Sequence, residues 1–348
     1  MLALAAPDGT PEILALRALK LGDLLVAVPA LKALRRGFPE HRLVLATTPW
    51  LEPIVDLVEG VDALVPTLHG LDDPLPIDQG RTELAVNLHG NGPESRRRLR
   101  EIAPQRTLEF RVPALDPGAG PGDPRPLWID GELERARWAR LVGSIGLDAD
   151  PDDVAIRIPE APAPVAGAAV VHIGAFYGSR EWPEERFAEV SRALAAEGRR
   201  VVYTGGANEA ARASRVAELA GTGEVLAGAV DLVEFAAVVA AAELVVTVDT
   251  GAAHLASAYA VPSVVIFGPA SPEAWGPPAS GPHVVLTDAS LRRGDVFSAE
   301  PDPALLAVQV DDVLAALASL PAREGARSRA GGVPRVRPSA AERPVAPA

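Results

Sequence analysis

The sequence contains no cysteine among its 348 residues. That absence excludes a disulfide framework, a thiolate metal site and a cysteine nucleophile. Positive charge is scarce as well, because 33 lysines and arginines stand against 46 aspartates and glutamates, which gives a formal net charge of -13. We therefore expect no general binding of nucleic acid, since such binding depends on clustered basic side chains.

Long hydrophobic runs are also missing. The longest uncharged stretch, 255–272, is interrupted by Pro262, Gly268, Pro269 and Pro272, which is typical of a strand with turns and not of a membrane span. No basic segment followed by a long apolar one opens the chain, so we expect no secretory signal. With 48% hydrophobic and 23% charged residues, the composition predicts a globular cytoplasmic protein.

Strand-like and helix-like segments alternate along the chain. In the first half, the apolar patterns predict strands at 12–19, 42–47 and 83–88, and helices at 23–38, 93–102 and 131–147. In the second half, they predict strands at 168–174, 199–206, 243–248 and 262–268, and helices at 184–198, 209–221, 231–242 and 303–320. Between the two halves lies the proline- and alanine-rich segment PDDVAIRIPEAPAPVAGAA, which is typical of a domain boundary.

This alternation predicts an α/β protein with two parallel, helix-covered sheets. We place one Rossmann-like domain at 1–160 and a second at 161–320, each with its own core. The Ala/Arg/Pro-rich tail at 321–348 is expected to be disordered. Ligands of such sheets bind beyond the carboxyl ends of the strands, so the polar residues at those ends are the candidate site.

The most informative strand end is the segment VDTGAAHLA. Thr250 and Gly251 are expected to begin a helix whose free amides and dipole attract an anion, and Gly251 allows a ligand to approach closely. His254 falls in the first turn, where it can add a donor. The alternative is that Asp249 or Thr250 only caps the helix and that His254 is a packed core residue.

A second strand end of the same half carries GAFYGSREWPEERF. Gly174 and Ser179 belong to a strand-end loop that its glycines make flexible, and Arg180 projects a permanent cation beside it. A solvated surface arginine is the alternative for Arg180. Two helix N-termini with an arginine between them favour a diphosphate ligand. At a third strand end, Glu209 can accept hydrogen bonds from a ribose or can simply complement the helix dipole.

In the first half, KLGDLLVAV has the same strand-to-helix geometry. Lys20 and Gly22 form the loop, and Asp23 follows them. As a structural residue, Asp23 would be the N-cap of the helix. As a functional residue, it would be a general base that takes a proton from an incoming hydroxyl.

Taken together and in this order, four segments resemble glycosyltransferase family 9, the ADP-heptose:lipopolysaccharide heptosyltransferases, from about residue 12 to about residue 320. The segments are LGDLLVAVPALKALRRGFPEHRLVLAT, GSREWPEERFAEV, GGANEAARA and LVVTVDTGAAHLASAYAVPSVVIFGPASPEAWGP. The resemblance implies the GT-B fold, in which two Rossmann-like domains face each other across a cleft. The first domain binds the acceptor and the second binds the nucleotide-sugar.

The resemblance also implies functions for individual residues. Asp23 matches the family's catalytic base, and Arg180 stands where the family has the lysine that contacts the donor diphosphate. Glu209 matches the ribose-binding glutamate, and Asp249, Thr250, Gly251 and His254 match the segment around the diphosphate. Arginine keeps the charge of lysine but changes the donor geometry. Transfer in this family inverts the anomeric carbon and needs no metal or other cofactor, and this sequence has no clustered His/Asp/Glu set.

Other signals are weaker. LHGNGPES lacks the third glycine of a dinucleotide-binding turn, so we expect a loop that faces the acceptor. The arginines of RRRLR (96–100), with Lys32, Arg35 and Arg36, form either a basic patch for a phosphorylated or membrane-anchored acceptor or a solvated helix face. Four histidines have no partner identifiable from the sequence: His41, His69, His89 and His283.

The sequence therefore favours a monomeric, metal-independent inverting glycosyltransferase. Its donor would be an ADP-activated heptose, and its acceptor a glycan or glycolipid at the inner face of the membrane. Two alternatives stay open at this point. One is another GT-B enzyme, such as a hexosyltransferase that uses UDP- or GDP-sugars or an epimerase. The other is a non-catalytic protein that binds nucleotide-sugars.

Overall fold

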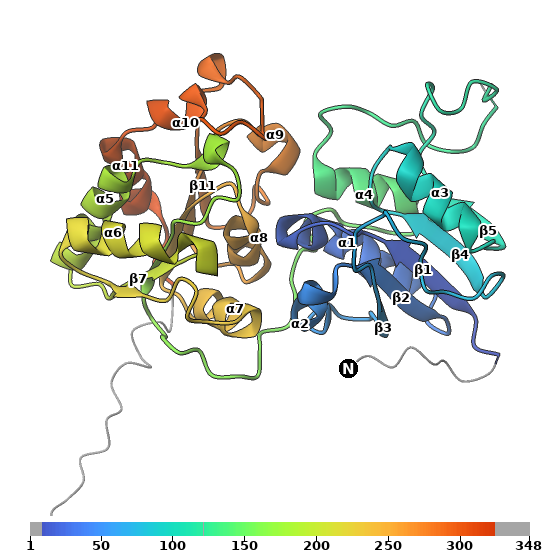
Figure 1. The fold of residues 1–348 in the computed structure, drawn as a ribbon, viewed down its shortest axis with the longest axis horizontal. Coiled ribbons are helices and arrows are strands. Elements are labelled where there is room, and N and C mark those ends of the chain that lie inside the picture. Colours follow the sequence, from blue (N-terminus) through green and yellow to red (C-terminus); the bar gives the residue numbers. More distant parts are fainter. Residues whose placement is uncertain (1–8, 121, 324–348) are drawn as a thin grey trace, which may run out of the picture.

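The structure is a computed structural model that describes residues 9–120 and 122–323. Two parallel sheets, each with helices, lie side by side in Figure 1. The α/β prediction with two Rossmann-like domains is therefore confirmed. Of the predicted disordered tail 321–348, all but its first three residues lie outside the described part of the chain. Within the described residues, no helix is long and apolar enough to cross a membrane.

The first sheet has five strands in the order β3-β2-β1-β4-β5. Its strands are β1 (Glu12–Leu16), β2 (Arg42–Thr47), β3 (Ala63–Pro66), β4 (Thr82–Asn87) and β5 (Arg106–Leu108). The helices of this half are α1 (Leu21–Gly37), α2 (Glu52–Val55), α3 (Pro93–Glu101) and α4 (Glu134–Gly143), with a 3-10 turn η1 (Pro49–Leu51) before α2. The short β3 was not predicted from the sequence, because four residues are too few to show a period.

The second sheet has six strands in the order β11-β10-β9-β6-β7-β8. Its strands are β6 (Ala169–His172), β7 (Val201–Thr204), β8 (Glu224–Val225), β9 (Leu244–Val248), β10 (Ser263–Ile266) and β11 (His283–Leu286). The helices are α5 (Glu184–Ala196), α6 (Ala210–Ala220), α7 (Leu232–Ala240), α8 (Gly251–Ala258), α9 (Pro272–Trp275), α10 (Pro303–Ala307) and α11 (Val310–Ser319). Three 3-10 turns complete this half: η2 (Gly178–Arg180), η3 (Ala207–Glu209) and η4 (Ala289–Leu291).

The single closing helix expected at 303–320 is wrong. The chain forms α10 and α11, and Val308 between them is extended, with φ -66° and ψ 118°. The carbonyl of Val308 accepts hydrogen bonds from Trp182 Nε1 at 3.1 Å and from Arg186 Nη1 at 2.7 Å. Because side chains bind this carbonyl and the Val308 side chain is buried in the core, tertiary contacts override the helical period.

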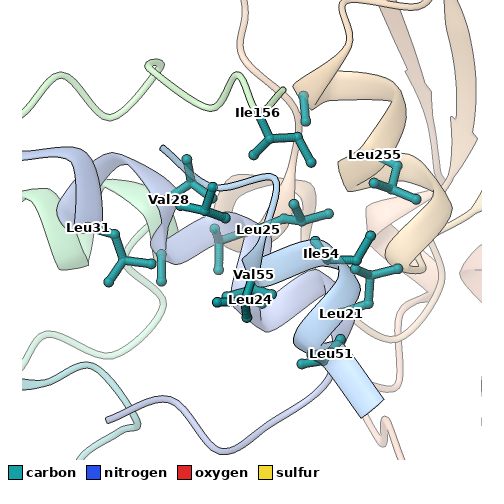
Figure 2. Close-up of a cluster of buried hydrophobic side chains, with 14 of the residues drawn as sticks. Leu21, Leu24, Leu25, Val28, Leu31, Leu51, Ile54, Val55, Ile156 and Leu255 are labelled. Carbon is teal, nitrogen blue, oxygen red and sulfur yellow. The ribbon is translucent and has the colours of Figure 1, made fainter. Parts of the chain in front are cut away.

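Each half has a core cluster of its own, and the two halves also share a larger one. One continuous apolar cluster includes residues of both sheets and of the helices between them. Figure 2 shows part of this cluster, with Leu21 and Ile54 of the first half on the side that faces Leu255 of α8. The two halves share this cluster because of α1. Its buried positions run without interruption from Leu24 to Leu34, so that it packs on its own sheet and also on α8.

A polar contact adds to this apolar interface. Arg135 on α4 donates hydrogen bonds to the carbonyl oxygens of Gly276 and, at 3.1 Å, of Pro277, which follow α9 in the other half. The same guanidinium pairs with Asp152 at 2.9 Å. The interface therefore fixes the beginning of α1 against the beginning of α8, which is where the candidate site lies.

Candidate active site

Asp23 lies in the first turn of α1, but it is not the N-cap that its position suggested. The helix begins at Leu21, Lys20 occupies the N-cap position, and Asp23 is the third helical residue. Asp23 Oδ2 accepts a hydrogen bond from the backbone amide of Lys20 at 3.2 Å. The acidic side chain of a third helical residue can accept a hydrogen bond from a free backbone amide, just as an N-cap side chain can. The sequence alone therefore could not tell which of these two positions Asp23 occupies.

Arg17, at the carboxyl end of β1, forms an ion pair with Asp23. Its side chain is 1% exposed, and its Nη2 lies 3.3 Å from Asp23 Oδ1 and 3.6 Å from a carboxylate oxygen of Glu134. Its Nε donates to the carbonyl of Asp23 at 2.8 Å, and its Nη1 donates to the carbonyl of Leu88. Burial lowers the pKa of Arg17, while Asp23 and Glu134 oppose that shift. We did not identify Arg17 from the sequence, although a charged residue at the end of an apolar strand is such a signal.

On the opposite side, Arg180 meets the end of β9. Its Nε lies 3.3 Å from Asp249 Oδ2, and the Asp249 side chain is 6% exposed. The Arg180 side chain is 20% exposed, so it is not the solvated surface arginine of the alternative interpretation. Its Nε is buried against Asp249 and makes no aligned hydrogen bond, so the contact between the two side chains is an ion pair.

The segment 249–254 forms the strand-to-helix turn that was predicted. Thr250 is the N-cap residue of α8 and Gly251 its first residue, so the first amides of the helix point out of this turn. The Thr250 side chain makes no capping hydrogen bond; its hydroxyl lies 3.2 Å from Thr247 Oγ1. Thr250 therefore occupies the N-cap position, as one alternative held, but its side chain does not cap the helix.

His254 lies where the two helix beginnings meet. A Cβ built on Gly22 would stand 2.8 Å from its Cδ2, and a Cβ built on Gly251 would stand 2.8 Å from Leu21 Cδ2. Burial lowers the pKa of His254, while the carboxylates of Asp249 and Asp23 raise it. Carboxylates from both domains are thus close enough to act on one imidazole.

Lys20 reaches from the first domain onto aromatic rings of the second. Its Nζ lies 3.1 Å from the centre of the Phe176 ring and 4.5 Å from that of Tyr177. Partial burial lowers the pKa of Lys20; Asp23 raises it, and Arg180 lowers it further. Lys20 and Arg180 therefore bring two cations to the same region, and this proximity is not visible in the sequence.

Glu209 lies beside the ends of β6 and β7. Its Oε1 accepts a hydrogen bond from the amide of Ala175 at 2.7 Å, and its Oε2 accepts one from the amide of Gly206 at 2.6 Å. A Cβ on Gly174 would stand 2.6 Å from Glu209 Oε2, so glycine is what lets the carboxylate approach this strand end. Each oxygen keeps a lone pair with which it can accept a further hydrogen bond.

The loop that holds Ser179 is firmly packed, in contrast to the flexible loop that its glycines suggested. Ser179 is fully buried, and its hydroxyl donates to the carbonyl of Val296 at 2.8 Å. A Cβ on Gly178 would stand 1.9 Å from the carbonyl oxygen of Ala299, so this glycine serves close packing. Ser179 therefore positions Arg180 by fixing the loop, and its hydroxyl is not directed at a ligand.

The predicted basic surface of α3 is present only in part, because Arg97 and Arg100 are 59% and 67% exposed while the other two arginines of the helix are buried. Arg96 is 2% exposed, and its Nη1 pairs with Asp116 at 3.0 Å. Arg98 is 7% exposed, pairs with Glu101 at 2.7 Å and donates to the carbonyls of Leu71 and Asp72. The remaining members of the group are also paired: Lys32 and Arg36 with Asp153, and Arg35 with Asp62.

The four histidines without an evident partner all have one in the structure. His41 pairs with Glu83, His69 with Asp73, and His283 with the Ser263 hydroxyl. His89 Nδ1 accepts a hydrogen bond from the amide of Ala18 at 3.2 Å, and burial together with Arg17 lowers its pKa to about 4. His89 is therefore a neutral neighbour of Arg17 on the first wall of the site.

Among the described residues, no three or more His, Asp or Glu side chains lie close enough together to hold a metal ion. The metal independence implied by the resemblance stays a prediction. What the structure does bring together is a carboxylate, Asp23, on one wall and the Arg180–Asp249 pair and the beginning of α8 on the other.

The family model of glycosyltransferase family 9 (heptosyltransferase) matches residues 156–292. Lipopolysaccharide heptosyltransferase 1 of Escherichia coli (strain K12) is 40% identical over 94 residues, which are 27% of this chain and 29% of that protein. The alignment thus spans less than a third of the length of that curated relative.

Solved structures extend the similarity to most of the chain. The family 9 glycosyltransferase of Veillonella parvula DSM 2008 has a TM-score of 0.70 at 19% identity and covers 88% of this chain and 96% of its own. The ADP-heptose LPS heptosyltransferase II of E. coli has a TM-score of 0.68 at 19% identity, with 88% and 97% covered. At such low identity these matches show a shared GT-B-like fold. Over residues 156–292 the chain thus resembles glycosyltransferase family 9, and over most of its length it shares the fold of solved structures of that family.

Proposed function

We propose that this protein is a heptosyltransferase that moves heptose from ADP-heptose to a hydroxyl of a glycan or glycolipid. The names of its relatives support this donor: one solved structure of the same fold is that of an ADP-heptose LPS heptosyltransferase. The observation that carries the proposal is that Gly22, the residue before Asp23 in the first domain, faces His254 of the second domain, whose helix begins directly after the Arg180–Asp249 pair.

In the proposed reaction, Asp23 is the general base. An Asp23 carboxylate oxygen takes the proton of the acceptor hydroxyl, and the acceptor oxygen forms a bond to the anomeric carbon of the donor. The bond between that carbon and the diphosphate oxygen breaks, and ADP leaves with the electron pair. Because attack comes from the side opposite the ADP, the configuration of the anomeric carbon inverts.

The second wall stabilises the charge that builds up on the leaving diphosphate. The Arg180 side chain is 20% exposed, and the first amides of α8 around Gly251 are free of helical acceptors. Both are fixed before the reaction, which makes them effective electrostatic stabilisers. We therefore propose that no metal ion is needed. His254 adds a donor to the same diphosphate, and Glu209 accepts hydrogen bonds from the ribose.

The setting of the reaction is part of the proposal. We propose a monomer that works in the cytoplasm, in peripheral contact with the inner face of the membrane when its acceptor is a glycolipid. Fractionation of the producing cells and light scattering of the purified protein test these two statements.

The decisive variant is Asp23→Asn. Asparagine keeps an oxygen that can accept the hydrogen bond from the Lys20 amide, so α1 should begin at the same residue. We expect acceptor-dependent release of ADP from ADP-heptose to fall by about two to four orders of magnitude, because the proton has no acceptor. Calorimetric affinity for ADP should be unchanged.

Two results contradict the proposal. One is normal turnover by Asp23→Asn. The other is a titration series in which UDP or GDP binds and ADP does not. Release of a free, epimerised sugar in the absence of any acceptor would show an epimerase instead.

A further inference from the structure

Lys20 belongs to the first domain, but its side chain lies on the second. It is the N-cap residue of α1, and its Nζ lies 3.1 Å from the centre of the Phe176 ring and 4.5 Å from that of Tyr177. We infer that this ammonium group binds the diphosphate of the nucleotide-sugar, so that the domain that carries Asp23 also supplies a cation to the donor. The inference rests on the proposed glycosyl transfer and adds a donor-binding residue to it.

The backbone next to Lys20 packs against the beginning of α8. A Cβ built on Gly251, the first residue of α8, would stand 2.8 Å from Leu21 Cδ2, and a Cβ built on Gly22 would stand 2.8 Å from His254 Cδ2. Leu21 and Gly22 directly follow Lys20 in the chain. The Lys20 side chain therefore starts beside the helix terminus whose free amides are proposed to stabilise the diphosphate.

The other end of the side chain lies at the turn that carries Arg180. Tyr177 immediately precedes this turn, η2, and its carbonyl accepts a hydrogen bond from the Arg180 amide at 3.0 Å. Arg180 in turn pairs with Asp249, which lies just before α8. Lys20 thus extends from the beginning of α8 to the Arg180 turn, and these are the two parts of the site that are proposed to face the diphosphate.

Two other arginines beside the strand ends of the second domain bind backbone oxygens. Arg212 Nη1 donates to the carbonyl of Ile173, directly after β6, at 2.7 Å. Arg292 Nε donates to the carbonyl of Gly268, after β10, at 2.9 Å. These two guanidinium groups therefore fix the strand-end loops around the site.

The charges of Arg180 and Lys20 are used differently. Arg180 Nε lies 3.3 Å from Asp249 Oδ2, so this pair as a whole has no net charge. Within residues 9–120 and 122–323, Lys20 Nζ contacts the two aromatic rings and forms no ion pair with a carboxylate. Lys20 is therefore a cation at this site whose charge no carboxylate balances at contact distance.

The two rings hold the ammonium group only weakly. Phe176 is 67% exposed, so water competes with the cation–π contact. An ion pair with a multiply charged phosphate is stronger than such a contact. The rings also have partners of their own, because Tyr177 packs edge-on against Phe176 and Phe297, with ring centres 4.8 Å and 5.2 Å away. Lys20 can therefore turn to the diphosphate while the rings stay in place.

The first test measures nucleotide binding by the full-length protein. ADP, UDP, GDP and adenosine are titrated calorimetrically into the unaltered protein, Lys20→Met and Lys20→Arg. We expect Lys20→Met to bind the preferred nucleoside diphosphate about tenfold more weakly and adenosine equally well, because adenosine has no phosphate. Lys20→Arg keeps the charge and should recover most of the affinity. The difference between Lys20→Met and the unaltered protein should shrink to about threefold in ~0.5 M NaCl, since salt screens an exposed ion pair.

A second variant separates this function from a purely structural contact between the domains. Phe176→Leu removes the ring beneath the ammonium group and keeps the charge, and the exposure of Phe176 lets the fold tolerate the change. We expect its affinity for the same nucleotide to be unchanged or higher, because Lys20 no longer leaves that ring to reach the diphosphate. Equal losses of affinity in Phe176→Leu and Lys20→Met would overturn the inference, since the contact would then only join the two domains.

Turnover is a separate measurement, so the inference and the proposed function can fail independently. If ADP-heptose is not turned over but Lys20→Met still weakens the binding of a nucleoside diphosphate, the transferase proposal fails and the inference is supported. If the unaltered protein releases ADP when acceptor is added and Lys20→Met keeps full nucleotide affinity, the inference is overturned and the transferase proposal is supported. Absence of affinity for all three nucleotides would also overturn the inference.

Discussion

Gly22 of the first domain and His254 of the second are in van der Waals contact across the interface. A Cβ at position 22 would stand 2.8 Å from His254 Cδ2 and 3.2 Å from its Nε2. The contact joins the first turn of α1, which carries Asp23, to the first turn of α8, which borders Asp249. The distance between base and diphosphate site therefore depends on the absence of a side chain at residue 22.

The first prediction concerns Gly22→Ala. The added methyl group displaces the His254 ring, so we expect kcat/KM for the donor to fall by about tenfold, a typical result of small misplacements in a site. The melting temperature should change little, because Gly22 is inside a helix where alanine is favoured. Gly143→Ala is the matched control: Gly143 is also helical and has nothing within 4 Å of its added Cβ. Full activity of Gly22→Ala would show that His254 does not need its position.

The second prediction concerns Arg17, which acts on the reaction only through Asp23. In Arg17→Met, the Asp23 carboxylate loses its cation at 3.3 Å, and the Asp23 carbonyl loses its donor at 2.8 Å. We expect kcat to fall by about tenfold while the KM for the donor stays unchanged, because the base is no longer held in place. Arg17→Lys keeps the charge and should restore part of kcat even if its melting temperature is also reduced. An unchanged kcat in Arg17→Met would show that Arg17 is purely structural.

The third prediction concerns stability at low pH. His172 lies at the end of β6 with its Nδ1 3.0 Å from Thr204 Oγ1, and burial lowers its pKa from 6.5 to about 4. The unfolded chain therefore binds a proton at a higher pH than the native protein does. The free energy of unfolding should be fully retained above about pH 7 and should fall by a few kcal/mol as the pH drops toward about 4.

Chemical denaturation across this pH range measures the effect. His172→Gln keeps hydrogen-bonding capacity and cannot titrate, so its unfolding free energy should fall less steeply with decreasing pH. His69→Gln is the control, because His69 is exposed and its pKa is raised by Asp73. Equal slopes for His172→Gln and the unaltered protein would contradict the prediction.

The sequence predicted those features that rest on local periodicity and on strand ends. The segment β9–α8 falls where its apolar run and Gly251 indicated, and β2 matches the predicted 42–47 without a shift. The short strand β3 was missed, and α1 begins two residues before the predicted start, because an acidic residue at the cap and one at the third position produce the same pattern.

Pairings between distant residues could not be predicted. Arg96 and Arg98 looked like solvated or ligand-binding cations, yet Arg96 pairs with Asp116 in the loop after β5, and Arg98 donates to carbonyls of the loop after β3. Nothing local in the sequence tells a paired arginine from a free one. For the same reason Arg17 went unnoticed, while Asp23 was selected from its position after a strand.

The final prediction concerns the pair Arg180 and Asp249. In Arg180→Gln the buried carboxylate of Asp249 loses its cation at 3.3 Å, so the free energy of unfolding should fall by about 1–3 kcal/mol. Because Arg180 also stabilises the leaving diphosphate, kcat should fall by about two to three orders of magnitude. Arg180→Lys keeps the charge and should recover part of both.

A double variant separates the two effects. Adding Asp249→Asn to Arg180→Gln removes the unpaired charge, so stability should return toward that of the unaltered protein. The loss of kcat should persist, since no cation faces the diphosphate. Recovery of both quantities together would mean that Arg180 matters only as the partner of Asp249, and the electrostatic part of the proposed mechanism would then be wrong.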